Sequence, residues 1–590
     1  MEMMESKRWL LVLTIFCVVK MTLAGTLTVT QRDSLFLEAL RILPEEKIPV
    51  QFRSKIQPSP IKCATITLMD VRRHFNLFTP EQRGLLQKLL ERPQLPLSYV
   101  SPDGLFKIHY TLEGSDAVSP EDLDQNGVPD YVEEVARAFE RSHQVEVIDL
   151  GFRPPPGDNG KDGPEFDVYI QNLGSQLYGY TQAEDQINST PREDLFSFIV
   201  IDNDYDVHFS RGLNGARVTA AHEYFHAIQF GYRIFQAEDE KFYYELSSVW
   251  MEEVVFDEIN DYYQYLRTFF TRTDVPFNQF DRFGHFLGEA LWNIFLQKKF
   301  NRLSAGAGFD LLRRTWEIME NNVPVMQAID QSLMEKGSRF ADEFVEFAFW
   351  NYFTGSRADS VNFYDESPAY PEIFINRTVE FTADTTLIDS SRSLTYKYFR
   401  FLPLISDQFS VTGQLLEPNR WKFGALTRSP GSNPVLHTFN IPSGQNLGFV
   451  PGSAEIVIIP VNIFIPENSN GTANTEFSRF QLTLQLGVLE KTERGIFQIF
   501  PNPFIVGQHR RIFFVFVPSE KTDLSVHIFS ADGRLIRAVN FSDGSGMLTR
   551  SSFVWDGRDD HGDLVASGVY LIQLKQGNFV DLKKFVVIRK

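Results

Sequence analysis

The pattern of apolar and polar positions divides the 590-residue chain into three regions with different periodicities. In the first, residues 25–100, short helical repeats alternate with prolines. The stretch PEQRGLLQKLLERPQLP at residues 80–96 has the pattern of an amphipathic helix that Pro93 ends. The pattern leaves two interpretations open for this part of the chain, a propeptide or a packed N-terminal cap.

The second region, residues 101–375, begins with predicted strands and ends with predicted helices. EFDVYIQNL (165–173) and LFSFIVIDND (195–204) have the length and character of strands, and DYVEEVARAFERSHQVEV (130–147) has helical periodicity. Helical patterns dominate after Val218. Strands followed by helices are typical of an α+β domain, here with a mainly helical C-terminal half.

The third region, residues 376–590, has the pattern of an all-β structure. Short alternating runs such as AEIVIIPVNIFI (454–465) are separated by Gly, Pro, Ser and Asn, as in β-sandwiches. A last unit contains LSVHIFSADGRLIRAV (524–539), which reads as two strands about an Asp-Gly turn. We therefore expect a multidomain fold in which two all-β sandwich domains, at 376–490 and 491–590, follow the α+β domain.

The net charge and the N-terminal sequence limit the classes of binding partner and the cellular location that we expect. A net charge of −19 and a pI near 5.1 argue against nucleic acid, because phosphate binding needs basic patches. Lys7 and Arg8 precede an apolar run at 9–19, and Ala24 closes a small-residue cleavage motif. Residues 1–24 are predicted to be a signal peptide, since about eleven apolar residues are too few to span a bilayer. We expect a secreted, extracellular or cell-surface protein with no membrane span in the mature chain.

After removal of the signal peptide, Cys63 is the single cysteine of the chain and cannot form an internal disulfide. We interpret it as a small buried side chain. The alternative is that it masks a metal from within a propeptide.

The stretch TAAHEYFHAIQFGY (219–232) carries the candidate chemistry. His222 and His226 lie four positions apart, so on a helix they share one face and can bind one zinc ion. Glu223 stands where metallopeptidases of this pattern have their general base. The alternative is a helix whose histidines only satisfy polar neighbours.

A catalytic zinc site needs a third protein ligand and an open position for water. The next helical stretch, KFYYELSSVWMEEVVFDEINDYY, offers Glu245, Glu252 and Glu253. Glu252 and Glu253 follow Trp250 and are expected beside the metal or in solvent rather than as its ligands. Asp257 on the same stretch is a candidate to orient a ligand imidazole, and a surface role is the equal alternative.

The stretch DLDQNGVPDYVE (122–133) matches an EF-hand loop at every ligand position. Gly127 permits the sharp turn that such a loop needs. The alternative is an Asn-Gly turn that caps the helix starting near Pro129. The oxygen donors that the loop would offer to one structural Ca²⁺ are Asp122, Asp124, Asn126, the Val128 carbonyl, Asp130 and Glu133.

Seven segments between Phe106 and Tyr263 occur in the order of a known family: HYTLEGSDAV, DQNGVPDYVEEVA, EFDVYI, LYGYT, VIDNDY, VTAAHEYFHAIQFGY and VWMEEVVFDEINDY. Together they resemble a family of secreted bacterial zinc metallopeptidases of the gluzincin type. Gluzincins have a glutamate as third ligand on the following helix, about 19 positions after the second histidine. The resemblance therefore implies zinc ligation by His222, His226 and Glu245, with Glu252 as the reserve ligand.

The resemblance also implies the reaction, hydrolysis of a protein or peptide substrate by a zinc-activated water with Glu223 as general base. The oxyanion then needs a donor besides zinc. His285 and Tyr232 are the candidates, and a structural role is the alternative for each. One departure concerns the third ligand, where the family has Glu-Gly-x-Ala and this chain has Glu245-Leu-Ser-Ser. This departure implies a different helix packing beside the metal.

The C-terminal stretches ADGRLIR, VWDGRDDHGDLVASGVYLIQL and KKFVVIRK resemble two modules of secreted bacterial proteins. These are the hook-cap-like immunoglobulin fold and the type IX secretion sorting domain, which imply secretion machinery as a partner. An ordinary terminal β-sandwich is the alternative. The sequence also leaves a second function open, that of an inactive metalloprotease-like surface protein with a binding or adhesion role.

Overall fold

The structure is a computed structural model, and contacts divide it into two compact units, residues 27–269 with 277–339 and residues 270–276 with 340–589. The predicted signal peptide lies outside the described residues. The residues that the structure describes are 27–43, 47–56, 62–157, 160–174, 177–187, 189–190, 192–281, 283–404, 407–417, 420–429, 432–441, 444–450, 452, 454–465, 477–486, 495–500, 502–506, 511–517, 524–541 and 551–589.

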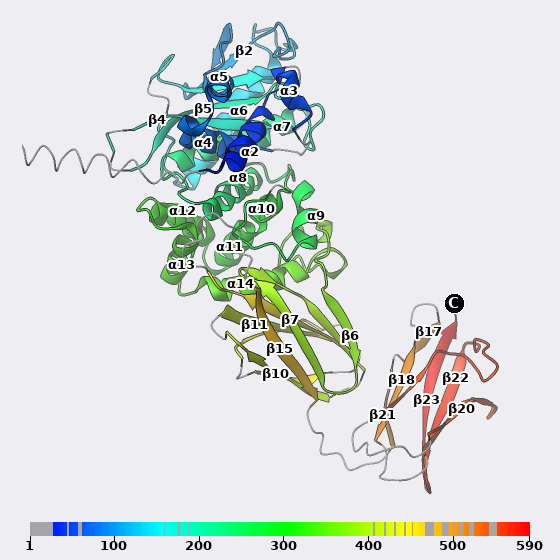
Figure 1. Cartoon of the computed structure of the whole chain (residues 1–590). Helices are drawn as coiled ribbons and strands as arrows, with labels where there is room; N and C mark the ends of the chain where they lie inside the picture. Colours follow the sequence, from blue (N-terminus) through cyan, green and yellow to red (C-terminus); the bar gives the residue numbers. More distant parts are fainter. Residues whose placement is uncertain are drawn as a thin grey trace, which may run out of the picture. The chain divides into compact units, whose positions relative to one another are not determined.

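A five-stranded sheet organises the first unit, with the strand order β1-β2-β3-β5-β4 (Figure 1). The strands β2, β3 and β5 are mutually parallel, whereas β1 and β4 run antiparallel to their neighbours. Because β4 is the last strand in this order, it forms an edge of the sheet. The strands are β1 (Leu97–Val100), β2 (Phe106–Tyr110), β3 (Phe166–Gln171), β4 (Gly179–Gln186) and β5 (Leu195–Asp202).

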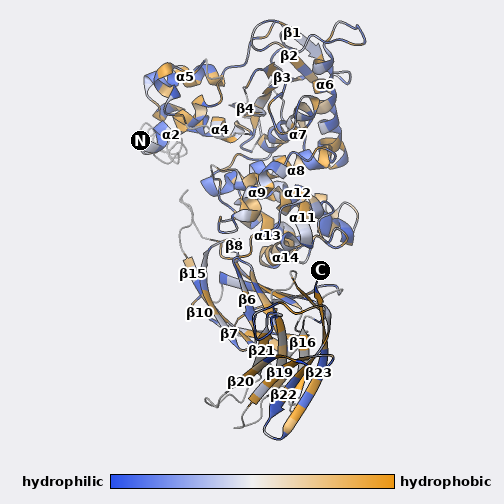
Figure 2. Cartoon of the chain, turned by 90° about the vertical axis from the view of Figure 1, so that its right-hand side faces the viewer, coloured by the Kyte–Doolittle hydropathy of each residue, from blue (hydrophilic) through white to orange (hydrophobic). Residues whose placement is uncertain are grey.

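Helices cover both faces of this sheet (Figure 2). On one face, the N-terminal helices share a hydrophobic core with Tyr169, Phe198 and Val200 of the sheet. On the other, Tyr224 packs against Phe106 and other aromatic residues. The N-terminal helices are α2 (Val29–Leu40), α3 (Val50–Arg53), α4 (Thr65–Arg73), the short η2 (Phe75–Leu77) and α5 (Pro80–Leu90); those near the other face are α6 (Asp130–His143), η3 (Gln144–Asp149) and α7 (Leu213–Phe230).

Local sequence explains where helix α5 begins. α5 starts at Pro80 after an N-cap at Thr79, whose hydroxyl accepts from the Gln82 backbone while Gln82 reaches back to Thr79. α7 is almost wholly buried, as expected of a helix at the centre of a domain, and its buried residues include His222, Glu223 and His226. The helices that follow it are η4 (Glu238–Glu240), α8 (Lys241–Val255), α9 (Tyr263–Thr271), α10 (His285–Gly288), α11 (Ala290–Leu303), α12 (Ala307–Met319) and α13 (Val325–Glu335).

In the second unit, a four-stranded and a six-stranded sheet pack around one hydrophobic core. Helix α14 (Phe340–Tyr352) packs on β11, where Gly424 leaves room for the ring of Phe349. The short helices are η5 (Gly355–Arg357) and η6 (Ser367–Ala369). The strands are β6 (Arg377–Phe381), β7 (Thr385–Arg392), β8 (Thr395–Tyr396), β9 (Phe399–Pro403), β10 (Asp407–Leu415), β11 (Trp421–Arg428), β12 (Val435–Phe439), β13 (Gln445–Val450), β14 (Glu455–Asn462) and β15 (Phe477–Leu486).

The C-terminal residues form a three-stranded and a five-stranded sheet with a core of their own. β19 and β20 pair about Asp532-Gly533, and Gly533 has a φ of +85°, so this hairpin follows the Asp-Gly pattern. The strands are β16 (Gly495–Phe500), β17 (Phe504–Val506), β18 (Ile512–Val517), β19 (Leu524–Ser530), β20 (Leu535–Phe541), β21 (Ser551–Trp555), β22 (Gly568–Gln576) and β23 (Phe579–Arg589).

The prediction of a multidomain chain with helices and several β-sheets is confirmed, and the finer boundaries stay predictions. The sequence pattern placed residues 340–353 in the helical half, whereas the contacts group α14 with the sheets of the second unit. Among the described residues, we find no helix with the length and apolar character needed to cross a membrane.

Candidate metal centre

Two neighbouring helices bring the predicted metal ligands together. His222 and His226 lie one turn apart on α7, with ring centroids 4.9 Å apart. Glu245 on α8 faces both, and its carboxylate oxygens lie 3.5 Å from His222 Nε2 and 3.5 Å from His226 Nε2. All three side chains are buried.

Cys63 joins these three residues. Ligand atoms of Cys63, His222, His226 and Glu245, here called the metal group, all lie within 4.8 Å of one another. A tetrahedral zinc ion with bonds of about 2.0–2.3 Å holds its ligand atoms roughly 3.3–3.8 Å apart. The two distances of 3.5 Å between Glu245 and the histidines fall within this range, so these three donors and their spacing fit zinc.

Hydrogen bonds orient both imidazole rings. Nδ1 of His222 lies 2.7 Å from Glu252 Oε1, and Nδ1 of His226 lies 2.8 Å from Gln229 Oε1. Both Nε2 atoms are buried and have no hydrogen-bond partner among the described residues. A ring whose Nδ1–H is held by an oxygen presents its other nitrogen as a metal ligand. Asp257, the predicted orienting carboxylate, is exposed, and Glu252 has this position instead.

The charges at the site depend on one another. Burial lowers the pKa of His222, but the carboxylates of Glu245 and Glu252 outweigh burial and raise it to about 9. Burial raises the pKa of Glu245, but both histidines outweigh this effect and lower it to about 2. Burial also raises the pKa of the Cys63 thiol, and the carboxylates of Glu223 and Glu245 raise it further.

Glu223 lies beside the metal group with one oxygen held and one without a partner. Its Oε2 accepts hydrogen bonds from the hydroxyls of Thr181 (2.9 Å) and Thr65 (3.1 Å). Its Oε1 is buried and has no hydrogen-bond partner in the described part of the chain. Gly179 on β4 makes this approach possible, because a Cβ there would lie 3.1 Å from Glu223 Cγ and 2.8 Å from Thr219 Cγ2.

A buried lysine extends the hydrogen-bond network. Lys62 Nζ lies 2.9 Å from Glu252 Oε2 and also pairs with the carboxylate of Asp261. The hydroxyl of Tyr178 donates to Asp261 Oδ1 at 3.0 Å. Because Glu252 also holds His222, the network runs without a break from the metal group to Lys62.

The Lys62–Thr65 segment lies along the start of β4. The backbone N–H of Tyr178 donates to the Lys62 carbonyl at 2.9 Å, and the N–H of Ala64 donates to the Gly179 carbonyl at 3.3 Å. The Thr181 N–H donates to the Thr65 hydroxyl at 2.8 Å. The segment runs parallel to β4 and pairs with it at Gly179.

The two candidate oxyanion donors lie outside the metal group. His285 is buried on α10, where its Nδ1 lies 3.0 Å from Glu289 Oε1. The hydroxyl of Tyr232 accepts a hydrogen bond from the backbone N–H of Arg153. An oxyanion role stays a prediction for both residues.

The predicted calcium loop folds back on its own carboxylates. Oxygens of Asp122, Asp124 and Asp130 lie within 4.8 Å of one another. The N–H of Gly127 donates to Asp122 at 2.8 Å, and Gly127 has a φ of +90°. The side-chain amide of Asn126 donates to Asp124 at 3.0 Å and to Glu133 at 2.8 Å. The side chains at loop positions 1, 3, 5, 9 and 12 therefore gather on one side of the turn.

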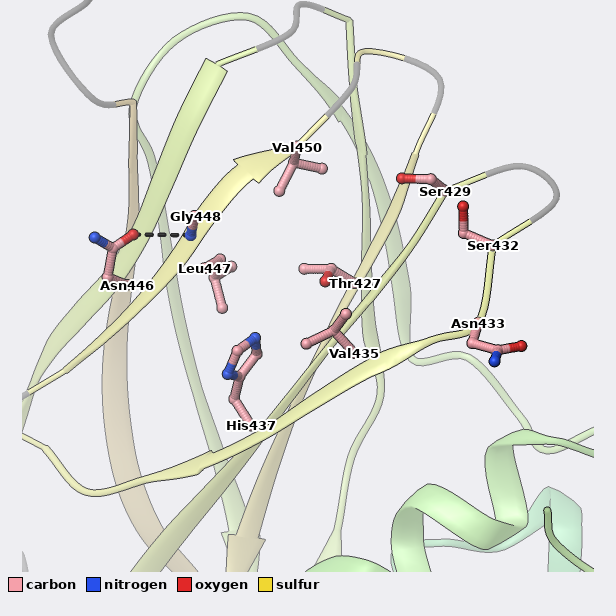
Figure 3. Close-up of a pocket in the computed structure, with 10 residues that line it drawn as sticks. All are labelled: Thr427, Ser429, Ser432, Asn433, Val435, His437, Asn446, Leu447, Gly448 and Val450. Carbon is pink, nitrogen blue, oxygen red and sulfur yellow. Dashed lines mark hydrogen bonds between the residues drawn. The ribbon is translucent and has the colours of Figure 1, made fainter.

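A separate pocket of about 630 Å³ lies in the second unit, between β11, β12 and β13 (Figure 3). Its lining combines hydroxyl, amide and imidazole groups with a few apolar side chains. The lining residues are Thr427, Ser429, Ser432, Asn433, Val435, His437, Asn446, Leu447, Gly448 and Val450.

Neither a family model nor a curated protein matches the chain. A solved structure of PorZ, a surface component of the type-IX secretion system of Porphyromonas gingivalis, is 18% identical and covers 26% of this chain, with a TM-score of 0.14; the match spans only 20% of PorZ. PliG from Aeromonas hydrophila, a periplasmic lysozyme inhibitor, is 12% identical over 19% of this chain and 96% of its own, also with a TM-score of 0.14. Likenesses at this TM-score carry no argument about fold or function.

Several residues of the site were not predicted from the sequence. Gln229 had a usable signal, because it lies one turn after His226 on the same helix face. Glu252 is the reserve ligand predicted from the sequence; in the structure it lies two turns after Glu245, orients His222 and is not part of the metal group. Lys62 and Thr65 gave no signal, since no periodicity connects them to α7.

Proposed function

We propose that the chain is a zinc-dependent metallopeptidase that hydrolyses peptide bonds. The observation that carries the proposal is the convergence of His222 Nε2, His226 Nε2 and the Glu245 carboxylate beside Glu223. The first three would hold the ion, and a bound zinc ion would polarise the substrate carbonyl and lower the pKa of its water to about 7.

The chain's own part in the reaction falls mainly to Glu223. Thr181 fixes Oε2 of the Glu223 carboxylate, which leaves Oε1 to accept a proton from the attacking water. Glu223 would then deliver this proton to the leaving amine. Glu252 and Gln229 hold the imidazoles in place, and contacts of this kind are typically worth 10- to 100-fold in metal affinity or activity.

The alternative function is that of an inactive metalloprotease-like surface protein. Cys63 is the observation that favours it, because structural zinc sites have four protein ligands whereas catalytic sites keep one position open. The pocket of the second unit, with its hydroxyl and amide groups, is where such a protein would bind a polar ligand. The two functions differ in whether the zinc-loaded chain hydrolyses peptides.

The deciding experiment uses the full-length Cys63→Ala chain, in which the fourth position of the metal group is open. We expect it to bind about one zinc ion per chain and to digest an unfolded protein, as followed by mass spectrometry. A chelator should stop the digestion and added zinc should restore it. A zinc-loaded chain that releases no peptide would favour the inactive alternative.

The remaining predictions belong to the same proposal. The metallopeptidase domain would comprise the α+β part of the chain, followed by two β-sandwich domains. The protein would be secreted or exposed on the cell surface, and its C-terminal domain would contact the secretion machinery. Its substrate would be a protein or peptide.

Calcium binding at the loop 122–133 is expected to stabilise the first unit. Ca²⁺ that binds only the folded chain adds about 1.4 kcal/mol of stability when its free concentration is about ten times Kd. We therefore expect the unfolding midpoint of the first unit to rise with millimolar calcium, because extracellular sites have a Kd of about 0.1–1 mM. Differential scanning calorimetry with and without calcium measures this shift. Asp124→Asn should abolish the shift, and an equal shift in that variant would contradict a site at this loop.

A further inference from the structure

We propose that the Lys62–Thr65 segment is a built-in inhibitor, in which the Cys63 thiolate is the fourth metal ligand and keeps the full-length chain latent. The inference rests on the metallopeptidase function proposed above, because it describes how that same centre is regulated. Three successive contacts of one short segment support it.

The first contact is with the metal group. Sγ of Cys63 is buried and lies within 4.8 Å of ligand atoms of both histidines and Glu245. The two histidine Nε2 atoms and Glu245 Oε1 are buried without hydrogen-bond partners among the described residues. After loss of its proton, the thiol would complete a tetrahedral site and take the position that water needs.

The second contact is with the proposed general base. The hydroxyl of Thr65 donates to Glu223 Oε2 at 3.1 Å and also receives the Thr181 N–H at 2.8 Å. The Thr65 hydroxyl therefore links the carboxylate of Glu223 to the backbone of β4.

The third contact is with the edge of the sheet. Extended peptides bind proteins by adding a strand to an exposed sheet edge, where backbone groups supply most of the affinity. The Lys62–Thr65 segment already pairs with Tyr178, Gly179 and Thr181 at the start of β4. A peptide substrate next to Glu223 would need the same backbone groups, so the segment and the substrate exclude each other.

Lys62 anchors the segment. Its ammonium group is buried between Glu252 and Asp261, and its carbonyl accepts from Tyr178. A purely structural zinc site would need only the fourth ligand. This segment also covers the proposed base and the edge of β4, which is the arrangement expected of an inhibitor.

The test compares the full-length wild type with Cys63→Ala and with Cys63→Ala/Thr65→Ala, each with one zinc bound. Zinc X-ray absorption should show one sulfur neighbour at about 2.3 Å in the wild type and none in the variants. Without the bond from zinc to sulfur, the segment is free to leave β4. If about 99% of wild-type molecules are closed, this opening should raise peptide hydrolysis by roughly 100-fold. The double variant also removes the Thr65 hydroxyl from Glu223. Circular dichroism and the unfolding midpoint check that each variant folds.

The outcomes separate this inference from the proposed function. Absence of sulfur from the wild-type zinc shell, or equal and measurable hydrolysis by wild type and variants, overturns the inference and leaves the peptidase standing. Sulfur in the wild-type shell with zinc-loaded variants that hydrolyse nothing overturns both, because Cys63 would then complete a structural site.

Discussion

In the Cys63→Ala chain, the further substitution Glu223→Gln is expected to lower kcat for peptide hydrolysis by roughly 10²–10⁴-fold, the usual contribution of a general base. The amide keeps an oxygen that can accept from Thr181, so the local structure should persist. It cannot take up a proton at neutral pH, so the proton transfer from the attacking water to the leaving amine is lost. Initial rates on a synthetic peptide measure the effect.

Zinc content separates the loss of the base from the loss of the metal. Glu223 is not part of the metal group, so Glu223→Gln should still bind about one zinc per chain. Glu258→Gln is the matched control, because Glu258 is exposed after α8 and should leave the rate unchanged. Unchanged hydrolysis in Glu223→Gln would show that another group acts as the base, or that the activity belongs to a contaminant.

The sequence contained the part of the site that is local in the chain. His222, Glu223 and His226 follow the geometry of one helix, in which residues four positions apart share a face. Glu245 needed an assumption about how two helices pack, which the family resemblance supplied. The structure brings these residues together because α7 and α8 are adjacent.

Sequence patterns do not predict the part of the site that depends on contacts between residues far apart in the chain. Asp257 was a reasonable candidate to orient an imidazole, but it lies on an exposed turn after α8, while Glu252 faces the metal group. Cys63 was interpreted mainly as a small buried side chain. Its position at the metal group depends on how the N-terminal segment lies along β4, and backbone pairing of this kind leaves no periodic signal.

Sequence patterns also do not predict which part of the chain a helix packs against, as α14 shows. The residues of α14 have a helical pattern, which says nothing about the element that will cover their apolar face. In the structure this face packs on β11, where Gly424 admits the ring of Phe349. Periodicity therefore predicted the helix but not the element that covers it, and the domain boundary stays a prediction.

Lys62→Met is expected to destabilise the first unit by about 3–5 kcal/mol, the usual cost of removing one partner from a buried ion pair. Methionine has a similar length and fits an apolar pocket, but it leaves the carboxylates of Glu252 and Asp261 without their cation. Chemical denaturation followed by tryptophan fluorescence measures the loss. Lys161→Met is the matched control, because its salt bridge to Glu184 is half-exposed and such pairs contribute at most about 1 kcal/mol.

The pH dependence of this loss identifies the ion pair as its cause. Burial raises the pKa of Asp261, but Lys62 outweighs burial and lowers it, so in the wild type Asp261 contributes stability at neutral pH that is lost as the pH falls through its folded-state pKa. Without Lys62, burial dominates and favours the protonated acid. The cost of Lys62→Met should therefore be largest near neutral pH and shrink as the pH falls toward about 4, the unfolded pKa of Asp. Adding Asp261→Asn to Lys62→Met should recover part of the stability, and a cost independent of pH and of Asp261 would attribute the loss to packing alone.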